Sequence, residues 1–212
     1  MKKSIATIFT IVTLSITLIS CKDKAKEADT KEAETVAVSE LSSEKYTVNT
    51  SESTIAWKGF KPTGSHNGTI AIENGVLNIA DGKINSGTFL IDMNSIKDVD
   101  ASAKLEGHLK NADFFDVEKF PTAAFEITSI ENVDGKTMLS GNLTLKDVKN
   151  NVTFPVSVTN KNNIITLTSE SFVIDRTKWN VQYGSKSIFD NLGDKFINDD
   201  IELQVTVKAT KS

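Results

Sequence analysis

Residues 108–121 read HLKNADFFDVEKFP, and they decide how the remaining sequence is interpreted. The segment combines a histidine, a pair of phenylalanines between two aspartates, and a proline. The sequence around it mostly alternates between apolar and polar residues, which is the pattern of half-buried β-strands. An aromatic, charged segment inside such a β framework either fills the core or forms the mouth of a ligand site.

The alternation of apolar and polar residues is clearest at residues 152–159 (VTFPVSVT) and 201–208 (IELQVTVK). Similar patterns predict further strands at residues 54–60, 69–73, 76–80, 87–92, 123–130, 139–145 and 164–174. Turns are predicted where Asn, Asp and Gly cluster, at residues 74–75, 81–82, 134–135, 149–151 and 160–163. Many short strands joined by tight turns indicate an antiparallel barrel or a sandwich, and periodicity does not distinguish the two.

Two segments depart from the strand pattern. Leu105 and Leu109 are four residues apart, which predicts a short helix over residues 101–111. Ile188 and Leu192 have the same spacing and predict a second helical turn near residues 185–192. Both are expected at the ends of the strands or in crossover connections.

The first residues are interpreted as an export signal. Two lysines precede an apolar stretch that ends in Leu-Ile-Ser-Cys, so residues 1–20 are predicted to be a signal peptide. The ending resembles a bacterial lipobox, and Cys21, the only cysteine, is expected to be the lipidated first residue of the mature chain. Residues 21–44 are rich in charged and small residues and are predicted to be a flexible tether, either disordered or a fraying helix. The folded domain is then expected at residues 45–212.

Charge and motifs exclude several classes of function. The chain has 24 basic and 28 acidic residues, and loss of the two lysines in the leader changes its net charge from −4 to −6. Nucleic acid is therefore not expected as a partner, because such domains carry a basic stripe. The sequence has no Gly-x-Ser-x-Gly elbow, His-Glu-x-x-His pair, Walker loop or GxGxxG motif. The two histidines could bind a metal with carboxylates such as Asp113 and Asp116, but their spacing does not require it, so no metal site is predicted.

The segment at residues 108–121 is similar to the signature of the YceI-like family, also called polyisoprenoid-binding lipocalin-like proteins. In that pattern a His-Leu pair, here His108 and Leu109, precedes Asp-Phe-Phe-Asp at residues 113–116. A proline then enters a strand that carries an aromatic residue, here Pro121 and Phe125. The resemblance covers about residues 45–209.

Three further motifs follow the family's order. They are Trp57-Lys58-Gly59 with Gly64–Gly68, Gly141–Val148, and Ile174-Asp175-Arg176. Asp147 stands where the family usually has glycine, which puts the details of that hairpin in doubt. The resemblance implies an all-β fold, an eight-stranded antiparallel lipocalin-like β-barrel with one or two short helices.

Aromatic side chains from different strands and from the 108–121 segment would line an apolar tube if they point inward. The residues expected to contact the tail of a ligand are Trp57, Phe60, Phe89, Phe114, Phe115, Phe125, Phe172 and Trp179. Phe114 and Phe115 are equally typical of core or plug residues.

Three residues are candidates for contacts with a polar head group, His66, His108 and Arg176. Arg176 is the only arginine beside 23 lysines, which indicates that its planar fork of donors is needed. Each candidate has a structural alternative. His66 lies between glycines and could be a polar turn residue, and His108 could interact with the carbonyls at a helix C-terminus. Arg176 could lock a loop through an ion pair, for which Asp113, Asp116 and Glu118 are the expected partners.

The lipobox-like ending predicts a protein of the bacterial envelope that is attached to the membrane through Cys21, on its periplasmic or surface face. The family resemblance implies a non-catalytic, lipid-binding function. The protein would carry or store an amphiphile with a long apolar tail, a polyisoprenoid, quinone or fatty-acyl derivative, and no cofactor other than such a lipid is expected. One alternative is a surface interaction module with a solid barrel, which predicts an exposed apolar patch. The other is an enzyme on a lipid-like substrate with His66 or His108 as general base, which predicts a carboxylate partner for that histidine inside the pocket.

Overall fold

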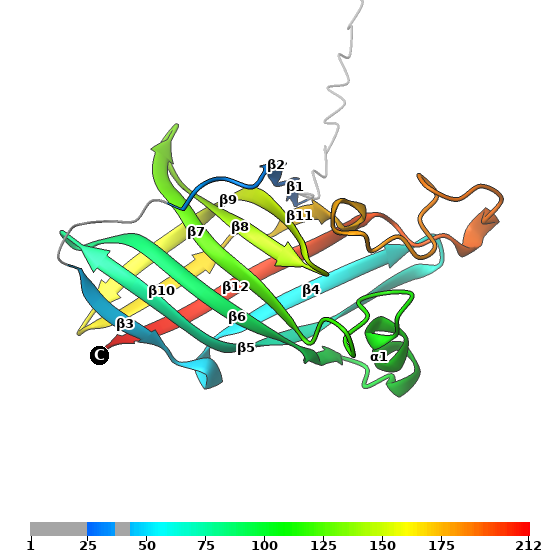
Figure 1. Ribbon diagram of the computed structural model, residues 1–212, viewed down its shortest axis with the longest axis horizontal. Coiled ribbons are helices and arrows are strands. Elements are labelled where there is room, and N and C mark those ends of the chain that lie inside the picture. Colours follow the sequence, from blue (N-terminus) through cyan, green and yellow to red (C-terminus); the bar gives the residue numbers. More distant parts are fainter. Residues whose placement is uncertain (1–24, 37–42) are drawn as a thin grey trace, which may run out of the picture.

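Antiparallel pairing closes the sheet into a ring of eight strands, so the predicted barrel is confirmed. The computed structural model describes residues 25–36 and 43–212, and its long strands wrap around one axis (Figure 1). The ring consists, in order, of β4 (Thr54–Lys61), β5 (Gly64–Ala80), β6 (Lys83–Asp98), β7 (Thr122–Val133), β8 (Lys136–Leu145), β9 (Val148–Lys161), β10 (Ile164–Ser169) and β12 (Asp200–Lys211), which pairs with β4 again.

Two positions in the ring are shared by two short strands each. The 3-10 turn η1 (Thr50–Glu52) separates β3 (Glu44–Val48) from β4, and both strands pair with β5 and β12. Likewise, β11 (Phe172–Asp175) follows β10, and both pair with β12. The long strands β5 and β12 therefore keep their backbone partners along most of their length.

The hairpin turns lie mostly where Asn, Asp and Gly predicted them. Asp81, Gly82, Asp134 and Gly135 have φ between 51° and 79°, the left-handed conformation that tight hairpins require. The prediction of a turn at residues 149–151 was wrong, because these residues belong to β9 and pair with β8.

The turn between β8 and β9 is formed by Lys146 and Asp147, at φ 49° and 60°. Asp147 thus adopts the left-handed conformation for which the family usually has glycine, and the hairpin forms without it. Aspartate tolerates this conformation better than most residues do.

The prediction of a turn at residues 74–75 was also wrong, since β5 runs through it as one strand with a register shift between Ile72 and Asn74. Gly75 serves close packing there. A Cβ on Gly75 would lie 2.8 Å from Phe89 Cδ1 and 2.9 Å from Val48 Cγ2. A glycine that makes room for neighbouring side chains has the same local sequence signature as a turn glycine.

The predicted helix is present as α1 (Ala103–Lys110), whose N-cap residue Ser102 accepts a hydrogen bond from the backbone N–H of Leu105. The second predicted helical turn is reduced to a single turn in which Phe189 N donates to Ser185 O at 2.9 Å. The short 3-10 turns η2 (Arg176–Trp179) and η3 (Gly193–Lys195) bracket that loop. The loop and α1 lie at the same end of the barrel (Figure 1).

The expected tether does not behave as a free linker where the structure describes it. Residues 25–36, here called the strap, lie against the barrel wall (Figure 1). Within the strap, β1 (Lys26–Glu27) pairs in parallel with β11, and β2 (Asp29–Glu32) pairs antiparallel with β9. Its charged composition predicted disorder. Pairing with an exposed strand edge uses backbone N–H and C=O groups, however, so it requires little apolar side-chain surface.

The strap fills a gap in the sheet between β9 and β11, here called the seam. The sequence of β9 explains why this gap exists. Glu170 N donates to Pro155 O at 3.1 Å, but proline has no N–H with which to return a bond. The ladder between β9 and β10 therefore ends at the pair of Val156 and Ser169, and β9 and β11 each pair with the strap beyond it. Ala28 is 5% exposed in this seam, and its N–H donates to Val173 O at 2.8 Å.

A side-chain clamp holds the far end of the strap. Glu34 N donates to Asn142 Oδ1 at 2.9 Å, and Asn142 Nδ2 donates to Glu34 O at 2.6 Å. Asn151 Nδ2 donates to the same Asn142 Oδ1 at 3.1 Å. Asn142 is thus buried with both of its polar atoms satisfied by the strap and the neighbouring strand.

We expect Ala28→Asp to release the strap, because an unpaired carboxylate in the seam costs several kcal/mol. Hydrogen exchange should show amide protection in residues 26–32 reduced at least about tenfold. Ala33→Asp is the matched control, since Ala33 is an exposed alanine of the same segment, and it should leave the protection unchanged. Equal protection in the two variants would show that the seam does not hold the strap.

Candidate ligand-binding site

The barrel encloses a cavity of about 320 Å³, near the lower end of the roughly 300–1,000 Å³ range of small-molecule sites. Its wall is apolar over most of its length, because the alternating strands direct one set of side chains inward. Among the lining aliphatic residues are Ile55, Ile70, Ile72, Ile91, Met93, Leu139, Leu143, Leu145, Val152, Leu167, Ile174, Leu203, Val205 and Val207. The wall suits a slender apolar chain better than a polar molecule.

The structure brings nearly all of the predicted tail-binding aromatic residues to this wall. The aromatic residues that line the cavity are Trp57, Phe60, Phe89, Phe114, Phe115, Phe125, Phe154 and Phe172. Phe154 belongs to this group because it shares the inward face of β9 with Val152 and Val156. Phe154 stacks on Phe172 at a centroid distance of 4.1 Å, and Phe125 lies 5.9 Å from Phe154.

Trp179 is the predicted tail residue that lies outside the cavity lining. It belongs to η2, is fully buried, and donates from Nε1 to Leu143 O at 2.9 Å. Because η2 follows the end of β11, the alternation of the strand does not determine where this side chain points. Trp179 instead fixes η2 against β8.

The segment at residues 108–121 closes one end of the cavity. Phe115 N donates to Leu109 O at 3.1 Å, and Val117 N donates to Lys110 O at 2.9 Å, so the segment folds back on α1. Phe114 and Phe115 are buried with their rings 5.0 Å apart, and both line the cavity. The segment therefore fills the end of the core and forms part of the mouth at the same time.

Both histidines line the cavity at this end, and each faces a carboxylate. His108 Nε2 lies 3.4 Å from Asp113 Oδ2, and His66 Nδ1 lies 3.7 Å from Asp98 Oδ1. The His108 ring also packs edge-on against Tyr183, with centroids 4.7 Å apart. The enzyme hypothesis predicted a carboxylate partner inside the pocket, but among the described residues neither Asp98 nor Asp113 lines the cavity. The two histidines themselves place polar groups at its wall.

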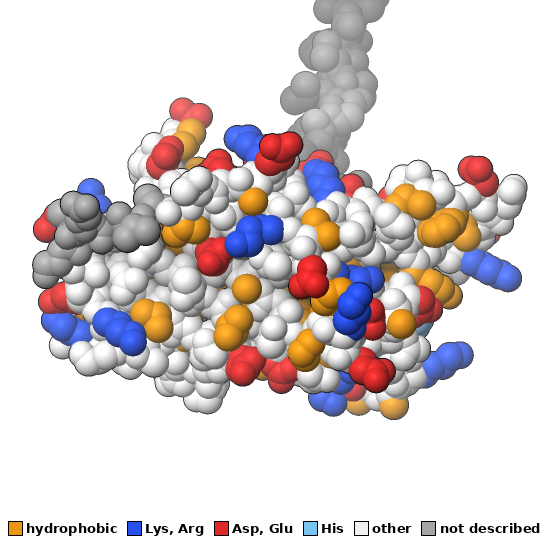
Figure 2. Space-filling view, in the orientation of Figure 1, with side chains coloured by type: hydrophobic (Ala, Val, Ile, Leu, Met, Phe, Trp, Pro, Cys, Tyr) orange, Lys and Arg blue, Asp and Glu red, His pale blue; other side chains and the backbone are white. Residues whose placement is uncertain are grey.

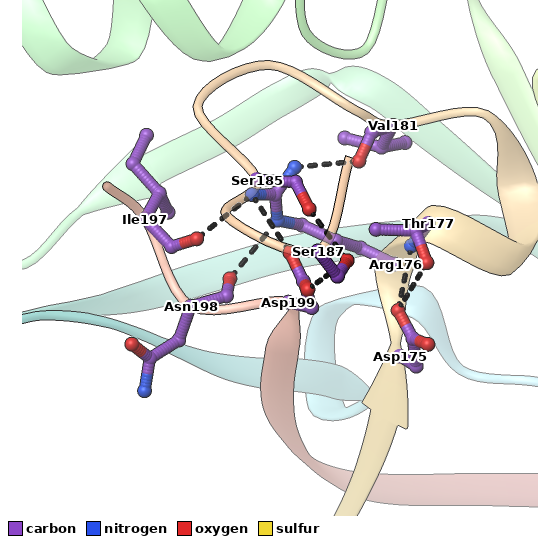
Figure 3. A network of polar contacts seen from close by, with 9 residues as sticks. All are labelled: Asp175, Arg176, Thr177, Val181, Ser185, Ser187, Ile197, Asn198 and Asp199. Carbon is purple, nitrogen blue, oxygen red and sulfur yellow. Dashed lines mark hydrogen bonds and ion pairs between the residues drawn. The ribbon is translucent and has the colours of Figure 1, made fainter. Parts of the chain in front are cut away.

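Arg176 is enclosed and bound by backbone carbonyls (Figure 3). Its Nε donates to Asn198 O at 3.0 Å, Nη1 to Val181 O at 2.5 Å, and Nη2 to Ile197 O at 3.1 Å. Its carboxylate neighbour is Asp199, at 3.6 Å, so the expectation of a partner among Asp113, Asp116 and Glu118 was wrong. These contacts join residues 176–199 into a closed loop over the mouth.

Burial lowers the pKa of Arg176, an effect that the charges of Asp199 and Asp175 partly offset. The guanidinium also lies 5.4 Å from the ring centroid of Phe114, within cation–π range. Arg176 lines the cavity, but most of its donors are engaged by the loop. Its contacts match the loop-locking alternative, and the contact with a head group stays a prediction.

Lys146 also helps to hold this end of the barrel together, although the sequence did not indicate it. From the β8–β9 turn its Nζ donates to Phe114 O at 2.7 Å and to Asn180 O at 3.3 Å. Burial lowers the pKa of Lys146, and the nearby charges of Asp116 and Asp113 act in the opposite direction. Lys146 thereby ties the segment at residues 108–121 to the loop over the mouth.

The loop over the mouth carries large apolar side chains on its surface. Tyr183, Ile188 and Phe189 are each more than 40% exposed. Figure 2 shows hydrophobic side chains reaching the surface at this end of the molecule, next to acidic and basic side chains like those spread over the rest of the visible face. An exposed apolar patch was expected for the interaction-module hypothesis, but here it flanks the opening of a hollow barrel.

A family model described as a YceI-like domain matches residues 46–209. The chain belongs to the YceI family. The match covers nearly the whole ring of the barrel and the segment at residues 108–121, which confirms the resemblance found in the sequence. No curated protein matches the chain. In the described residues no helix has the length and apolar character needed to cross a membrane.

Solved structures with the YceI fold agree with this assignment. Burkholderia cenocepacia BcnA aligns at 22% identity and a TM-score of 0.60, covering 77% of this chain and 99% of that chain. A protein described as a polyisoprenoid binding domain from Saccharophagus degradans, implicated in plant cell wall breakdown, aligns at 12% identity and a TM-score of 0.58, covering 79% and 98%. At such low identities the likeness shows the fold alone.

Proposed function

We propose that this protein is a lipid-anchored protein of the bacterial envelope whose barrel carries or stores an amphiphile with a long apolar tail. The observation that carries the proposal is the apolar cavity of about 320 Å³, which is lined by strands from around the ring and has only a few polar residues in its wall. Each methylene group transferred from water into such a cavity contributes about 0.8 kcal/mol before ordering costs. Binding of a tail therefore needs no specific polar contact.

The size and the polar end of the cavity narrow the class of ligand. A volume near the lower limit of ligand sites favours a slender chain, so that a long tail would extend through the mouth. His66 and His108 lie at the mouth and would contact the head group, and Arg176 would contribute mainly by holding the loop in place. The Saccharophagus degradans relative, described as binding polyisoprenoid, supports an isoprenoid chain, and quinone or fatty-acyl derivatives share the same chemistry.

Attachment to the membrane through a lipid on Cys21 forms part of the proposal and rests on the sequence. Cys21 and the leader at residues 1–20 lie outside the described residues. The lipobox-like ending and the single cysteine support lipidation. Metabolic labelling with a fatty-acid analogue should mark the wild-type chain and not a Cys21→Ala variant.

Native mass spectrometry of residues 22–212, produced with an export leader and purified from a bacterial envelope, tests the carrier function. A stoichiometric adduct that organic solvent extracts as a long-chain lipid is the expected result. A mass equal to that of the bare chain, unchanged after incubation with polyprenyl and quinone lipids, would overturn the proposal. The interaction-module hypothesis would then be the better account.

The two tryptophans offer a test of where the ligand lies. Trp57 lines the cavity, whereas Trp179 is buried outside its lining. A quinone should therefore quench most of the fluorescence of Trp179→Phe, in which Trp57 alone emits, and little of that of Trp57→Phe. Fluorescence titration of the two variants with one quinone measures this difference. Equal quenching in both variants would indicate that the lipid binds outside the barrel.

The paired carboxylates of the two histidines favour one second candidate, an enzyme that acts on the bound lipid. In that case His66 or His108 would serve as general base inside the pocket. Incubation of the loaded protein, followed by mass spectrometry of the extracted lipid, separates the two functions. A carrier returns the lipid unchanged, whereas an enzyme returns a product that His66→Gln or His108→Gln no longer forms.

A further inference from the structure

We propose that His66, Asp98 and Asp100 bind a divalent transition-metal ion at the mouth of the barrel. An imidazole nitrogen and two carboxylate oxygens of these residues lie within 4.8 Å of one another. His66 lies near the start of β5, Asp98 is the last residue of β6, and Asp100 lies in the connection to α1. The inference does not depend on the lipid function, and it revises the sequence-based expectation of no metal site.

The interior of this group contains polar atoms that lack hydrogen-bond partners. The Asp98 side chain is 0% exposed, and its Oδ2 accepts a hydrogen bond from Ser102 N at 3.2 Å. Among the described residues, neither Asp98 Oδ1 nor His66 Nδ1 has a hydrogen-bond partner. These two buried atoms face each other at 3.7 Å, beyond hydrogen-bonding distance. A buried carboxylate oxygen without a partner is costly, and a cation between the two atoms would satisfy both.

The spacing of these atoms suits coordination. Bonds of about 2.0–2.2 Å to nitrogen and oxygen place two tetrahedral ligands about 3.4 Å apart, so that His66 and Asp98 would need to shift by only a few tenths of an ångström. Asp100 is exposed and can adjust its position. A neutral imidazole and two carboxylates balance a charge of +2. The mixed nitrogen and oxygen donors suit Zn²⁺ and neighbouring first-row ions, whereas Ca²⁺ and Mg²⁺ prefer oxygen alone.

The other charges near the group are already engaged. Lys97 Nζ lies 3.1 Å from Glu106 Oε2, and Glu106 Oε1 accepts a hydrogen bond from Asp98 N at 3.1 Å. Glu106 therefore neutralises Lys97 and is not free to act as a ligand, which leaves His66, Asp98 and Asp100 as the donors.

The second histidine provides an internal comparison. His108 faces the single carboxylate of Asp113, which is 46% exposed, at 3.4 Å. Among the described residues, the His66 group is the only one in which three possible ligand atoms lie this close together. A histidine with one exposed carboxylate binds metal weakly, so only the His66 group should show stoichiometric binding.

Isothermal titration calorimetry tests the proposal, with ZnCl₂ and residues 22–212 carrying no histidine tag. This chain retains every described residue and removes the thiol of Cys21. We expect one Zn²⁺ per chain, with affinity reduced at least tenfold in His66→Gln and in Asp100→Asn, and unchanged in His108→Gln. Because Asp100 is exposed, its variant keeps the test valid even if His66→Gln does not fold.

Nitrogen NMR of the histidine side chains in the wild-type chain gives a second readout. Zn²⁺ should shift the Nδ1 resonance of His66 and leave that of His108 in place. The absence of stoichiometric binding would overturn the proposal, and so would binding that survives in both Asp100→Asn and His66→Gln. A pH-dependent His66 resonance that does not respond to Zn²⁺ would indicate a plain ion pair with Asp98 and would also overturn it.

Discussion

Replacement of Arg176 by methionine should lower the free energy of unfolding by about 3–5 kcal/mol, the cost typical of breaking a buried ion pair. The side chain is fully buried and satisfies the carbonyls of Val181, Ile197 and Asn198 as well as facing Asp199. Methionine has a similar reach but no donor, so these acceptors would be left unpaired in the interior. Urea denaturation measures the loss, and hydrogen exchange should show the loop at residues 181–199 opening first.

Arg176→Lys is the matched control for this prediction. Lysine keeps the positive charge but cannot direct donors to three carbonyls in the plane of a guanidinium. We expect it to be less stable than the wild type and more stable than the methionine variant. If the free energy of unfolding of the methionine variant is within about 1 kcal/mol of the wild-type value, other contacts hold the loop. The hydrogen bonds of Lys146 would then be the first to examine.

Trp179→Ala should also cost about 3–5 kcal/mol, the range for removing a large aromatic side chain from a core. Trp179 is fully buried and holds η2 against β8 through its hydrogen bond to Leu143 O. Thermal unfolding should show a decrease in Tm of the variant. The fraction that remains folded should still bind lipid, because Trp179 does not line the cavity.

Trp57→Ala is the comparison for Trp179→Ala. Trp57 is partly exposed and lines the cavity, so its loss should reduce stability less and lipid retention more. Retention can be measured by native mass spectrometry on both variants. If Trp179→Ala remains stable but loses the lipid, the prediction from sequence that Trp179 contacts the tail was right after all.

The sequence predicted the barrel wall well because the wall depends on a local rule. Inward and outward side chains alternate along each strand, so Phe89, Phe125 and Phe172 could be assigned to the interior from their positions alone. The segment at residues 108–121 was recognisable because aromatic and charged residues interrupt that rule. The stretches where this pattern was clear correspond to the lining of the cavity.

The predictions that failed depended on contacts between distant residues. Asp199, the partner of Arg176, lies 23 positions further along the chain in a loop without periodicity. At position 75 a glycine is needed because a Cβ there would collide with Phe89 and Val48. Trp179 follows the end of a strand, where alternation no longer applies. The strap is the clearest case, because its own composition gives no reason to fold. Its partners are the backbone edges that Pro155 leaves open between β9 and β11.

If Cys21 carries the proposed lipid, the docked strap would also set the height of the barrel above the bilayer. With the proposed lipid on Cys21, a free linker as far as Glu44 could let the domain rise roughly 75 Å, at about 3.3 Å per extended residue. With Lys26 paired beside Phe172, the linker between Cys21 and the barrel shortens to five residues, or about 17 Å. The lipid would then pull on the flank of the barrel and not on one end, so the molecule would lie on its side, close to the lipid surface.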